Sequence, residues 1–194
     1  MPIFKLLITI LNIPRCLLHL LFFCIYIKKC KLDVLVGIEH RQYKCCLVIG
    51  FLYLLVFDKT YRNLFYYRIG RWKYLIFYWL PPHSSFSIGT YASIGEGMLC
   101  IHPFATIINA TSIGRNFSVK NNVTIGAHKG GKPIIGNNVS INVNCVIVGN
   151  ITIGNNVIIG TGSIVMKDVP DNCVVVGNPA YILKQNGILK KTLL

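Results

Sequence analysis

An aliphatic residue returns every six positions between residues 135 and 165. This column consists of Ile135, Ile141, Ile147, Ile153, Ile159 and Val165. A spacing of six fits neither the turn of an α-helix nor the two-residue alternation of a strand, and a fixed short period is typical of stacked units that bury one continuous core. The period predicts a parallel β-helix, in which each hexad forms one flat face of a triangular coil and three hexads close a coil.

Two further features of this stretch agree with that fold. A second column, four residues after the first, holds mostly small or β-branched residues, as a crowded inward position requires. Its members are Val139, Cys145, Ile151, Val157, Ser163 and Val169. The corner positions are rich in glycine and asparagine, which tolerate the positive φ of sharp turns. The alternative, a β-sandwich with Asn-Gly hairpins, predicts alternation and variable spacing, so we expect a mainly β protein of hexapeptide repeats.

The first part of the chain has a different character. Positions 1–80 hold twelve lysines and arginines against three acids, whereas positions 81–194 hold eight against three, for a net charge of +14. Two apolar runs, residues 16–27 and 46–57, are each 12 residues long, and a membrane-spanning helix needs roughly 20. Pro14 and Arg15 separate the first run from the apolar residues before it. The segment also lacks the cleavage site of a secretory signal, so we expect packed helices that are prone to contact a membrane.

Residues 58–82 combine positive charge with aromatic rings. Nine aromatic residues lie between Tyr61 and Trp79, interleaved with Arg62, Arg68, Arg71 and Lys73, and two prolines end the helical part. Such a composition suits an anionic membrane surface. It equally suits a helical cap whose aromatic rings pack on the first coil while its cations are solvated. Nucleic acid is not expected as a partner, because the surrounding segment is too apolar.

The eight cysteines do not predict a disulfide framework. Cys45 and Cys46 are adjacent, no C-x-x-C motif occurs, and Cys100, Cys145 and Cys173 fall in or near the repeat, where a free cysteine serves as a small hydrophobic residue. This pattern favours a reducing compartment. We therefore expect a cytoplasmic protein, with peripheral attachment to the inner face of the cytoplasmic membrane as a further hypothesis.

Two interruptions of the period each contain a histidine. The period begins at Ile88, is broken after Glu96 and resumes at Ile107; a second break covers residues 126–134. His102 lies in the first break and His128 in the second. Insertions in a solenoid form external loops, which often build its binding face. Because the two breaks are roughly one coil apart, we expect both histidines on one edge of the solenoid.

Several motifs in residues 86–183 resemble one known family. They are GMLCIHPFATIINATSIG, VTIGAHKGGKPIIGNNV, GTGSIVMKDVP and VVGNPAYIL. Together they are similar to the hexapeptide-repeat acyltransferases, in the serine acetyltransferase-like branch that also includes O-acetyltransferases of polysaccharide gene clusters. The resemblance implies a left-handed parallel β-helix over residues 83–183, preceded by a helical segment over 1–82 and followed by a tail over 184–194. It also implies acetyl-CoA as acyl donor, no metal, and a homotrimer with its sites between subunits.

The resemblance places the catalytic general base at His102. Acyl transfer to a hydroxyl needs a base for the hydroxyl proton, and histidine is suited to that task. The position also agrees with the residues themselves, because His102 stands at a break beside a proline; a structural histidine in the loop is the alternative. Ser87 aligns with the acid that orients this histidine, and His128 is a weaker candidate for a second catalytic histidine. Asn109 and Lys132 align with acceptor-binding positions.

The resemblance also assigns residues to the cofactor. Two turns would let the pantetheine arm approach the backbone, and two lysines would meet the phosphates as point charges, although solvated surface charges are the alternative for these lysines. The set consists of Gly160, Thr161, Gly162, Lys167, Gly177, Asn178, Pro179, Ala180 and Lys184.

The chain departs from the serine acetyltransferases where charge matters. The acid before the catalytic histidine is replaced by Ile101, the orienting acid by Ser87, and an Arg-His pair by Gly131 and Lys132. A free amino acid needs charged partners for its ammonium and carboxylate groups. The sequence therefore predicts an O-acetyltransferase acting on a saccharide hydroxyl in surface polysaccharide synthesis, with serine O-acetylation in cysteine biosynthesis as the alternative. A non-catalytic, membrane-associated β-helix scaffold is the hypothesis from another class.

Overall fold

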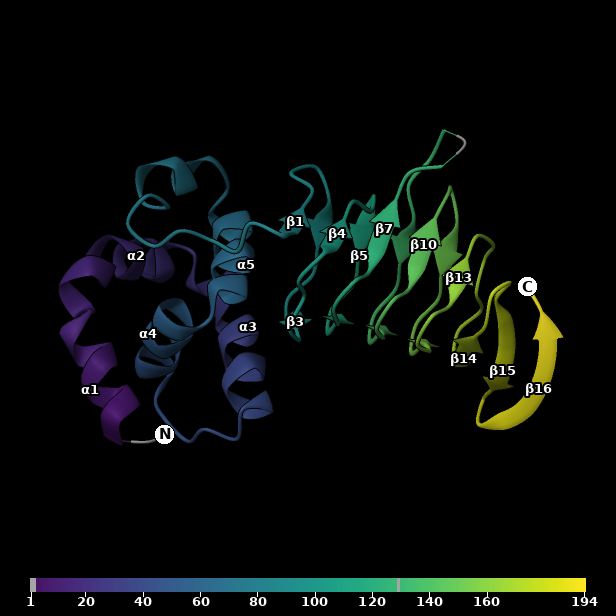
Figure 1. Cartoon of the computed structure of the whole chain (residues 1–194), viewed down its shortest axis with the longest axis horizontal. Helices are drawn as coiled ribbons and strands as arrows, with labels where there is room; N and C mark the ends of the chain where they lie inside the picture. Colours follow the sequence, from purple (N-terminus) through teal and green to yellow (C-terminus); the bar gives the residue numbers. More distant parts are fainter. Residues whose placement is uncertain (1–2, 129) are drawn as a thin grey trace. The chain divides into compact units, whose positions relative to one another are not determined.

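A computed structural model describes residues 3–128 and 130–194. The chain divides into two compact units, the first ending at Ser84 and the second running from Ser85 to Leu194. We refer to them as the helical unit and the solenoid, and each is described by itself (Figure 1).

The helical unit contains five α-helices and one 3₁₀ helix. They are α1 (Ile3–Leu11), α2 (Ile13–Ile25), α3 (Ile27–His40), α4 (Leu47–Phe57), α5 (Lys59–Ile69) and η1 (Gly70–Leu75). Helices α1 and α2 meet at a bend of 80°, and Pro14 lies in the first turn of α2, where its missing N–H is not needed. The predicted break at Pro14 is therefore confirmed.

The core of this unit is built around α4. Phe51, Leu54 and Leu55 are fully buried, and the ring of Phe51 stacks on that of Phe23 at 4.1 Å between centroids. The side chain of Asp58 accepts hydrogen bonds from two N–H groups in the first turn of α5, so it caps that helix. The second predicted apolar run is thus the central helix of the unit.

Two of the cations predicted to be exposed are internal. Arg62 is buried and donates hydrogen bonds to the carbonyl oxygens of Leu55, Val56 and Pro81 at 2.6 to 2.8 Å. Arg68 is also buried and forms a two-pronged ion pair with Asp33, at 2.8 and 3.1 Å. A buried guanidinium needs such acceptors. The expectation that Arg62, Arg68, Arg71 and Lys73 all face lipid or solvent is therefore wrong for Arg62 and Arg68.

The solenoid consists of three parallel sheets wound as triangular coils. Sheet A holds β1 (Phe86–Ile88), β4 (Thr106–Ile108), β7 (Thr124–Gly126), β10 (Val146–Val148) and β13 (Ile164–Val165); sheet B holds β2 (Ser93–Ile94), β5 (Ser112–Ile113), β8 (Ile134–Ile135) and β11 (Thr152–Ile153); sheet C begins with β3 (Leu99–Cys100), β6 (Ser118–Val119), β9 (Ser140–Ile141), β12 (Ile158–Ile159) and β14 (Cys173–Val176). The predicted parallel β-helix is confirmed.

The six-residue period corresponds to burial. Ile135 pairs with Ile153 and Ile141 with Ile159, so one coil advances 18 residues. Every member of the first column from Ile135 to Val165 is buried, and so is every member of the second column from Val139 to Val169. Both predicted columns therefore point into the core, and Cys145 is buried among them as predicted.

Asparagines form a ladder along the edge where sheet B turns into sheet C. Asn116 donates to Asn138, Asn138 to Asn156 and Asn156 to Asn172, at 2.9 to 3.0 Å. All four have positive φ, between 55° and 58°. Asparagine tolerates this conformation better than other residues with a side chain, so the corner residues serve both the turn and the stacking of coils.

The solenoid ends in an antiparallel hairpin that the sequence analysis did not predict. Strands β15 (Tyr181–Gln185) and β16 (Ile188–Leu193) follow β14 in sheet C and pair antiparallel. The boundary predicted before Lys184 lies inside β15, so residues 184–194 comprise the last two residues of β15 and the whole of β16. Asn186 and Gly187, both with positive φ, connect them, and this Asn-Gly pair is the local signal of a tight hairpin.

Candidate active site

The candidate base lies at a sharp corner of the first coil. His102 follows β3 on the edge where sheet C turns into sheet A, which we call the C–A edge. Its side chain is exposed, its φ is 48°, and Ala105 also has positive φ, at 50°. The His102 carbonyl accepts a hydrogen bond from the Phe104 N–H at 2.8 Å. This tight turn holds the imidazole outside the core, where a substrate can reach it.

The C–A edge continues to the glycine turn predicted to bind the cofactor. Gly160, Thr161 and Gly162 connect β12 to β13, three coils beyond His102. With about 4.8 Å between neighbouring coils, the two sites are about 14 Å apart along the edge, a span that the extended arm of a coenzyme can bridge. The structure thus brings the predicted base and the predicted cofactor turn onto one edge.

Glycine is needed at the two positions of this turn for different physical reasons. A Cβ on Gly160 would meet Val176 at 2.6 Å, so this glycine is needed for packing against β14. Gly162 has a φ of 73° and open space around its missing Cβ. A ligand can therefore approach the backbone at Gly162, whereas Gly160 supports the turn from inside.

The second predicted cofactor loop adjoins this turn. The carbonyl of Gly177 accepts a hydrogen bond from the Ile164 N–H at 3.1 Å. Gly177 has a φ of 98°, and the peptide bond between Asn178 and Pro179 is cis. Ala180 is buried, so the loop is anchored at its end and exposed at Asn178 and Pro179.

The two predicted phosphate-binding lysines lie in different surroundings. Lys167 starts from the corner after β13, and its ammonium donates to the carbonyl oxygen of Leu194. The Leu194 N–H in turn donates to the Ala180 carbonyl oxygen at 3.4 Å, so Lys167 is linked to the closing loop through the last residue. Lys184 is exposed on β15, opposite Val174.

The acceptor-binding candidates gather on another edge, where sheet A turns into sheet B. Asn109 follows β4 on this A–B edge, and a loop between β7 and β8 contains His128 and Lys132. The hydroxyl of Thr111 donates to the Lys132 carbonyl oxygen at 3.2 Å. The backbones of His128 and Gly131 are bridged, and the loop protrudes from the solenoid (Figure 1). Asn109 and Lys132 therefore lie on the same edge in adjacent coils.

The prediction that His102 and His128 share one edge is wrong. The two residues are 26 positions apart, while a regular coil such as Val146 to Ile164 spans 18. His128 therefore lies one coil and one face beyond His102, on the A–B edge. Its loop lengthens its own coil to 22 residues, from Thr124 to Val146, but leaves the position of the edges unchanged.

Ser87 and Ile101 align with the two acids of the serine acetyltransferases, and neither places a negative charge beside His102. Ser87 is exposed on β1 and pairs with Ile107 of β4. No hydrogen bond joins the side chains of Ser87 and His102 in the described part of the chain. Ile101, next to the base, is half-buried and uses its N–H to bond the Val119 carbonyl oxygen at 2.9 Å.

Gly131, which aligns with an arginine of the serine acetyltransferases, packs closely against Asn150. A Cβ on Gly131 would lie 2.3 Å from the Cβ of Asn150 on the next coil, closer than atoms can approach. An arginine at this position would need the loop to move. The loss of a positive charge here is therefore built into the packing of the loop.

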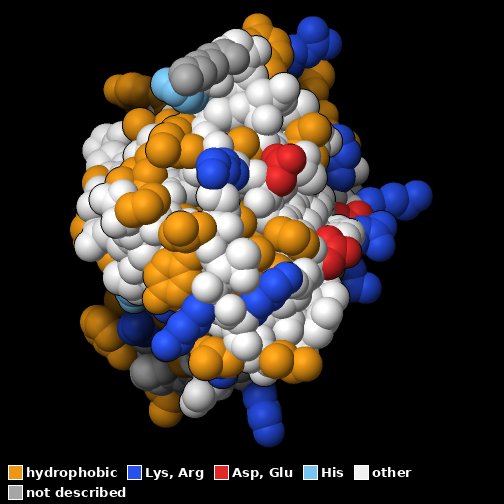
Figure 2. Space-filling view, turned by 90° about the vertical axis from the view of Figure 1, so that its right-hand side faces the viewer, with side chains coloured by type: hydrophobic (Ala, Val, Ile, Leu, Met, Phe, Trp, Pro, Cys, Tyr) orange, Lys and Arg blue, Asp and Glu red, His pale blue; other side chains and the backbone are white. Residues whose placement is uncertain are grey.

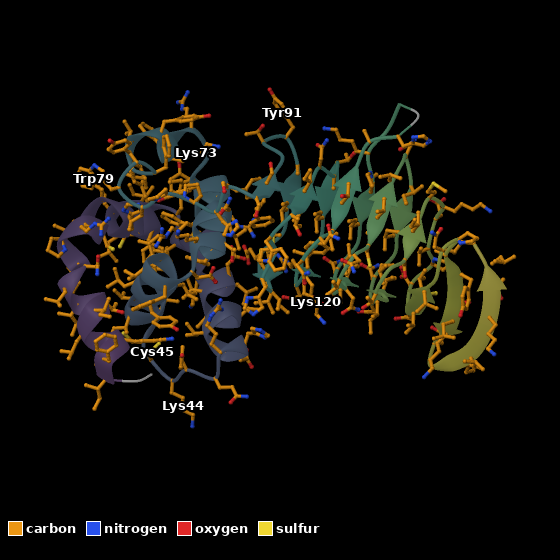
Figure 3. The ribbon with its side chains drawn as sticks, viewed as in Figure 1. Lys44, Cys45, Lys73, Trp79, Tyr91 and Lys120 are labelled. Carbon is orange, nitrogen blue, oxygen red and sulfur yellow. The ribbon has the colours of Figure 1, made fainter. Side chains whose placement is uncertain are left out.

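One further residue of the C–A edge, Lys120, was not among the predicted site residues. Lys120 follows β6 on the C–A edge, one coil beyond His102, since Cys100 pairs with Val119. Figure 3 shows Lys120 on one side of the solenoid and Tyr91, on the A–B edge, on the other. The signal was its place in the repeat: Lys120 is the first corner residue after the inward-pointing Val119.

Among residues 3–128 and 130–194, no three His, Cys, Asp or Glu side chains are grouped so that they could hold a metal ion.

Comparisons with known proteins agree on one group. Residues 132–167 match the family described as bacterial transferase hexapeptide (six repeats). Serine acetyltransferase 3, mitochondrial, of Arabidopsis thaliana is 46% identical over 99 residues, which cover 47% of this chain and 25% of that protein. The serine acetyltransferase of Synechococcus elongatus is 36% identical over 102 residues, covering 50% and 42%. The chain thus spans less than half the length of these relatives.

A solved structure extends the likeness to most of the chain. The crystal structure of the serine acetyltransferase of Neisseria gonorrhoeae has a TM-score of 0.65 and 31% identity, and the match covers 86% of this chain and 67% of that one. The coiled architecture, the residue columns and the motifs of the C–A edge agree with this likeness. The chain therefore belongs to the hexapeptide-repeat acyltransferases, in the branch of the serine acetyltransferases.

Proposed function

We propose that the chain is an acetyl-CoA-dependent O-acetyltransferase with His102 as general base. The observation that carries the proposal is the C–A edge. It presents an exposed histidine at one end, and at the other a glycine turn with open backbone at Gly162, beside the Gly177 loop. A donor with a long thioester arm would lie along this edge and bring its acetyl group to His102.

The reaction follows from the chemistry of the groups. The imidazole of His102 takes the proton of the acceptor hydroxyl while the oxygen attacks the acetyl carbonyl carbon. The carbon–sulfur bond then breaks, and the imidazolium returns the proton to the departing sulfur. The products are an acetyl ester and the free thiol of coenzyme A, and no covalent enzyme intermediate is needed.

The acceptor best supported by the comparisons is serine. The relatives reported above are named serine acetyltransferases, so serine, the alternative in the sequence analysis, now ranks first. No comparison supports the polysaccharide acceptor that the sequence analysis placed first. One observation still favours a saccharide as second candidate: Ser87, Ile101 and Gly131 stand where charged partners would be needed, and an arginine in place of Gly131 would need the loop to move away from Asn150.

The division of candidates between two edges supports a shared site. His102 lies on the C–A edge, while Asn109, His128 and Lys132 lie on the A–B edge. In a closed ring of three copies, the C–A edge of one subunit can face the A–B edge of the next. We therefore propose a homotrimer whose sites are completed between subunits, with a small-molecule acceptor.

The test compares two exposed histidines. Purified full-length protein is mixed with acetyl-CoA and either L-serine or a panel of sugars, and free thiol is followed. His102→Ala is expected to lower turnover by about 10² to 10⁴. His40→Ala, at an exposed site of α3, is the control and is expected to change it much less. Equal activity of wild type and His102→Ala would refute the base, and faster release with a sugar than with serine would reverse the order of acceptors.

A binding measurement separates this proposal from a scaffold without catalysis. A ligand at a hundred times its Kd stabilises the folded state by about 2.7 kcal/mol, so acetyl-CoA is expected to raise the melting temperature. If millimolar acetyl-CoA leaves the melting temperature unchanged and no thiol is released with any acceptor, the scaffold hypothesis is correct.

A further inference from the structure

Helix α1 places its apolar face outward and its polar residues inward. Leu7 and Leu11 are 54% and 77% exposed, whereas Thr9 is only 2% exposed. The Thr9 hydroxyl donates to the Lys5 carbonyl oxygen at 2.8 Å, and the Lys5 ammonium reaches the Tyr53 hydroxyl at 3.5 Å. A helix that packs on a protein core normally does the reverse. The exposed face of α1 is therefore suited to an apolar or interfacial partner.

Helix α2 repeats this arrangement. His19 is fully buried, and its Nε2 lies 3.0 Å from the hydroxyl oxygen of Tyr66. Leu17, Leu21 and Ile25 are each more than half exposed. Each of the two helices thus presents an apolar face to the exterior, and exposed apolar surface of this kind marks an interaction site.

An aromatic segment extends the same surface. Trp72 and Trp79 are 42% and 47% exposed, and both contact α2: the ring of Trp72 lies 6.0 Å from that of Phe22, and the Trp79 carbonyl oxygen accepts a hydrogen bond from Arg15 at 2.9 Å. Figure 3 shows Trp79 at the margin of the helical unit, and Lys73 is half-buried. We call α1, α2 and residues 70–79 the apolar–aromatic surface.

Positive charge borders this surface. The guanidinium of Arg71 lies 5.8 Å from the ring centre of Trp72, and the ammonium of Lys73 lies 5.2 Å from that of Tyr74. Of the three acids in residues 1–80, Asp33 is paired with Arg68 and Asp58 with Arg41. The exterior of the helical unit is therefore strongly positive, and it complements a negatively charged partner.

We propose that the apolar–aromatic surface docks the protein on an anionic lipid bilayer, with α1 and α2 lying in the interface. In the described residues no single helix is long and apolar enough to cross a membrane; α1 and α2 together pass by length and composition but are bent by 80°. Helices with outward apolar faces, aromatic rings and flanking cations are typical of interfacial binding. A second copy of the chain fits less well, because it would bring like charges together.

The two tryptophans of the chain make this proposal directly measurable. Both Trp72 and Trp79 lie in the apolar–aromatic surface, and the chain has no others. Full-length protein is mixed at low salt with vesicles of phosphatidylcholine containing roughly one third phosphatidylglycerol. We expect the protein to sediment with the vesicles, the fluorescence to shift to the blue, and brominated lipids to quench it. Vesicles of phosphatidylcholine alone are expected to bind more weakly.

Matched variants separate charge from apolar contact. Arg71→Gln with Lys73→Gln is expected to weaken binding to the anionic vesicles roughly thirtyfold, because each cation near the membrane surface strengthens binding roughly fivefold. The control, Lys190→Gln with Lys191→Gln on β16, removes the same charge far along the sequence and is expected to have little effect. Leu7→Ser with Leu21→Ser is expected to weaken binding at least tenfold, and Val48→Ser, at an exposed position of α4, much less.

Two results would overturn the proposal. One is wild-type protein that stays in the supernatant at low salt with unquenched tryptophans. The other is a change of oligomeric mass in the Leu7→Ser, Leu21→Ser variant, measured without vesicles, together with unchanged vesicle binding; the surface would then be an interface between copies. Circular dichroism of each variant establishes that it is folded.

Discussion

In the solenoid Ile147 and Ile159 point inward and are fully buried, whereas in α2 of the helical unit Leu17 and Leu21 are more than half exposed and His19 is buried. The solenoid buries its two periodic columns within its own coils, because every hexad has the same inward positions. The helical unit uses buried hydrogen bonds and an ion pair inside and leaves leucines outside. The difference shows that a repeated inward position buries aliphatic residues in the solenoid, whereas α2 buries a histidine and exposes leucines that a partner can contact.

The largest effect on stability is expected from breaking the internal ion pair of the helical unit. Asp33→Ala leaves the buried guanidinium of Arg68 without its carboxylate, which should cost about 3–5 kcal/mol. Urea unfolding followed by tryptophan fluorescence measures this, because both tryptophans lie in the helical unit.

The double variant Asp33→Leu, Arg68→Met serves as the control. It replaces the pair by apolar side chains of similar size and should recover most of the loss. An unchanged urea midpoint in Asp33→Ala would contradict the view that polar contacts organise this core.

A pair of truncations tests the contrast between buried and exposed aliphatic residues. Ile147→Ala opens a cavity in the solenoid and should cost about 2–5 kcal/mol. Leu21→Ala removes an equally apolar but exposed side chain and should change the free energy of unfolding by less than about 0.5 kcal/mol. Chemical unfolding followed by circular dichroism compares them. Equal losses would mean that Leu21 is packed in the protein in solution.

The buried histidine of α2 makes the helical unit sensitive to acid. Tyr66 donates its hydroxyl proton to the Leu80 carbonyl oxygen, so its oxygen accepts the hydrogen bond that His19 donates from Nε2. Burial, and then the charge of Arg62, lower the pKa of His19 from 6.5 to about 4. The unfolded chain therefore binds a proton that the folded chain does not, and on the order of 2 to 3 kcal/mol of stability should be lost as pH falls from 6.5 to 4.

This acid sensitivity is measured by urea titrations at several pH values. His19→Gln should flatten the pH dependence in this window, while His40→Gln, at an exposed site of α3, should leave it as in the wild type. A steep loss that persists in His19→Gln would assign it to other groups.

Among the variants expected to lose stability, those of the asparagine ladder in the solenoid should lose the least. Asn156→Ala loses two ladder hydrogen bonds and places an alanine at a φ of 56°, which should cost about 1–2 kcal/mol. Asn156→Gly keeps the backbone relaxed and loses only the side-chain bonds, so it should cost less. If both variants unfold at the same urea concentration, the ladder bonds matter more than the conformation.

The sequence was most informative where local pattern and burial coincide. The columns at Ile135 and Val139 could be found because inward positions recur at a fixed spacing, whatever the rest of the chain does. The break at Pro14 was visible for a similar reason, since the constraint is local. The glycine turn at Gly162 followed from the same repeat.

The remaining features depend on contacts between distant parts of the chain. The burial of Arg68 depends on Asp33, 35 positions earlier, and no local pattern indicates it. The separation of His102 from His128 depends on which face of the coil receives the insertion. The 26 positions between the two residues exceed one coil of 18 and indicate different edges. The terminal hairpin, by contrast, has a local signal in Asn186 and Gly187, which lie outside the hexapeptide repeat.

The antiparallel hairpin at the end of the solenoid also has a consequence for polymerisation. A parallel coil that ends in open strands is a template on which a further coil of another molecule can pair. Here β15 and β16 reverse direction, and β16 is exposed along its whole length, with Lys190 and Lys191 beside the exposed Ile188 and Leu189. Figure 2, which looks onto this side of Figure 1, shows Lys and Arg side chains among hydrophobic ones. The reversed direction and the two lysines oppose the addition of a further parallel coil from another molecule at this end.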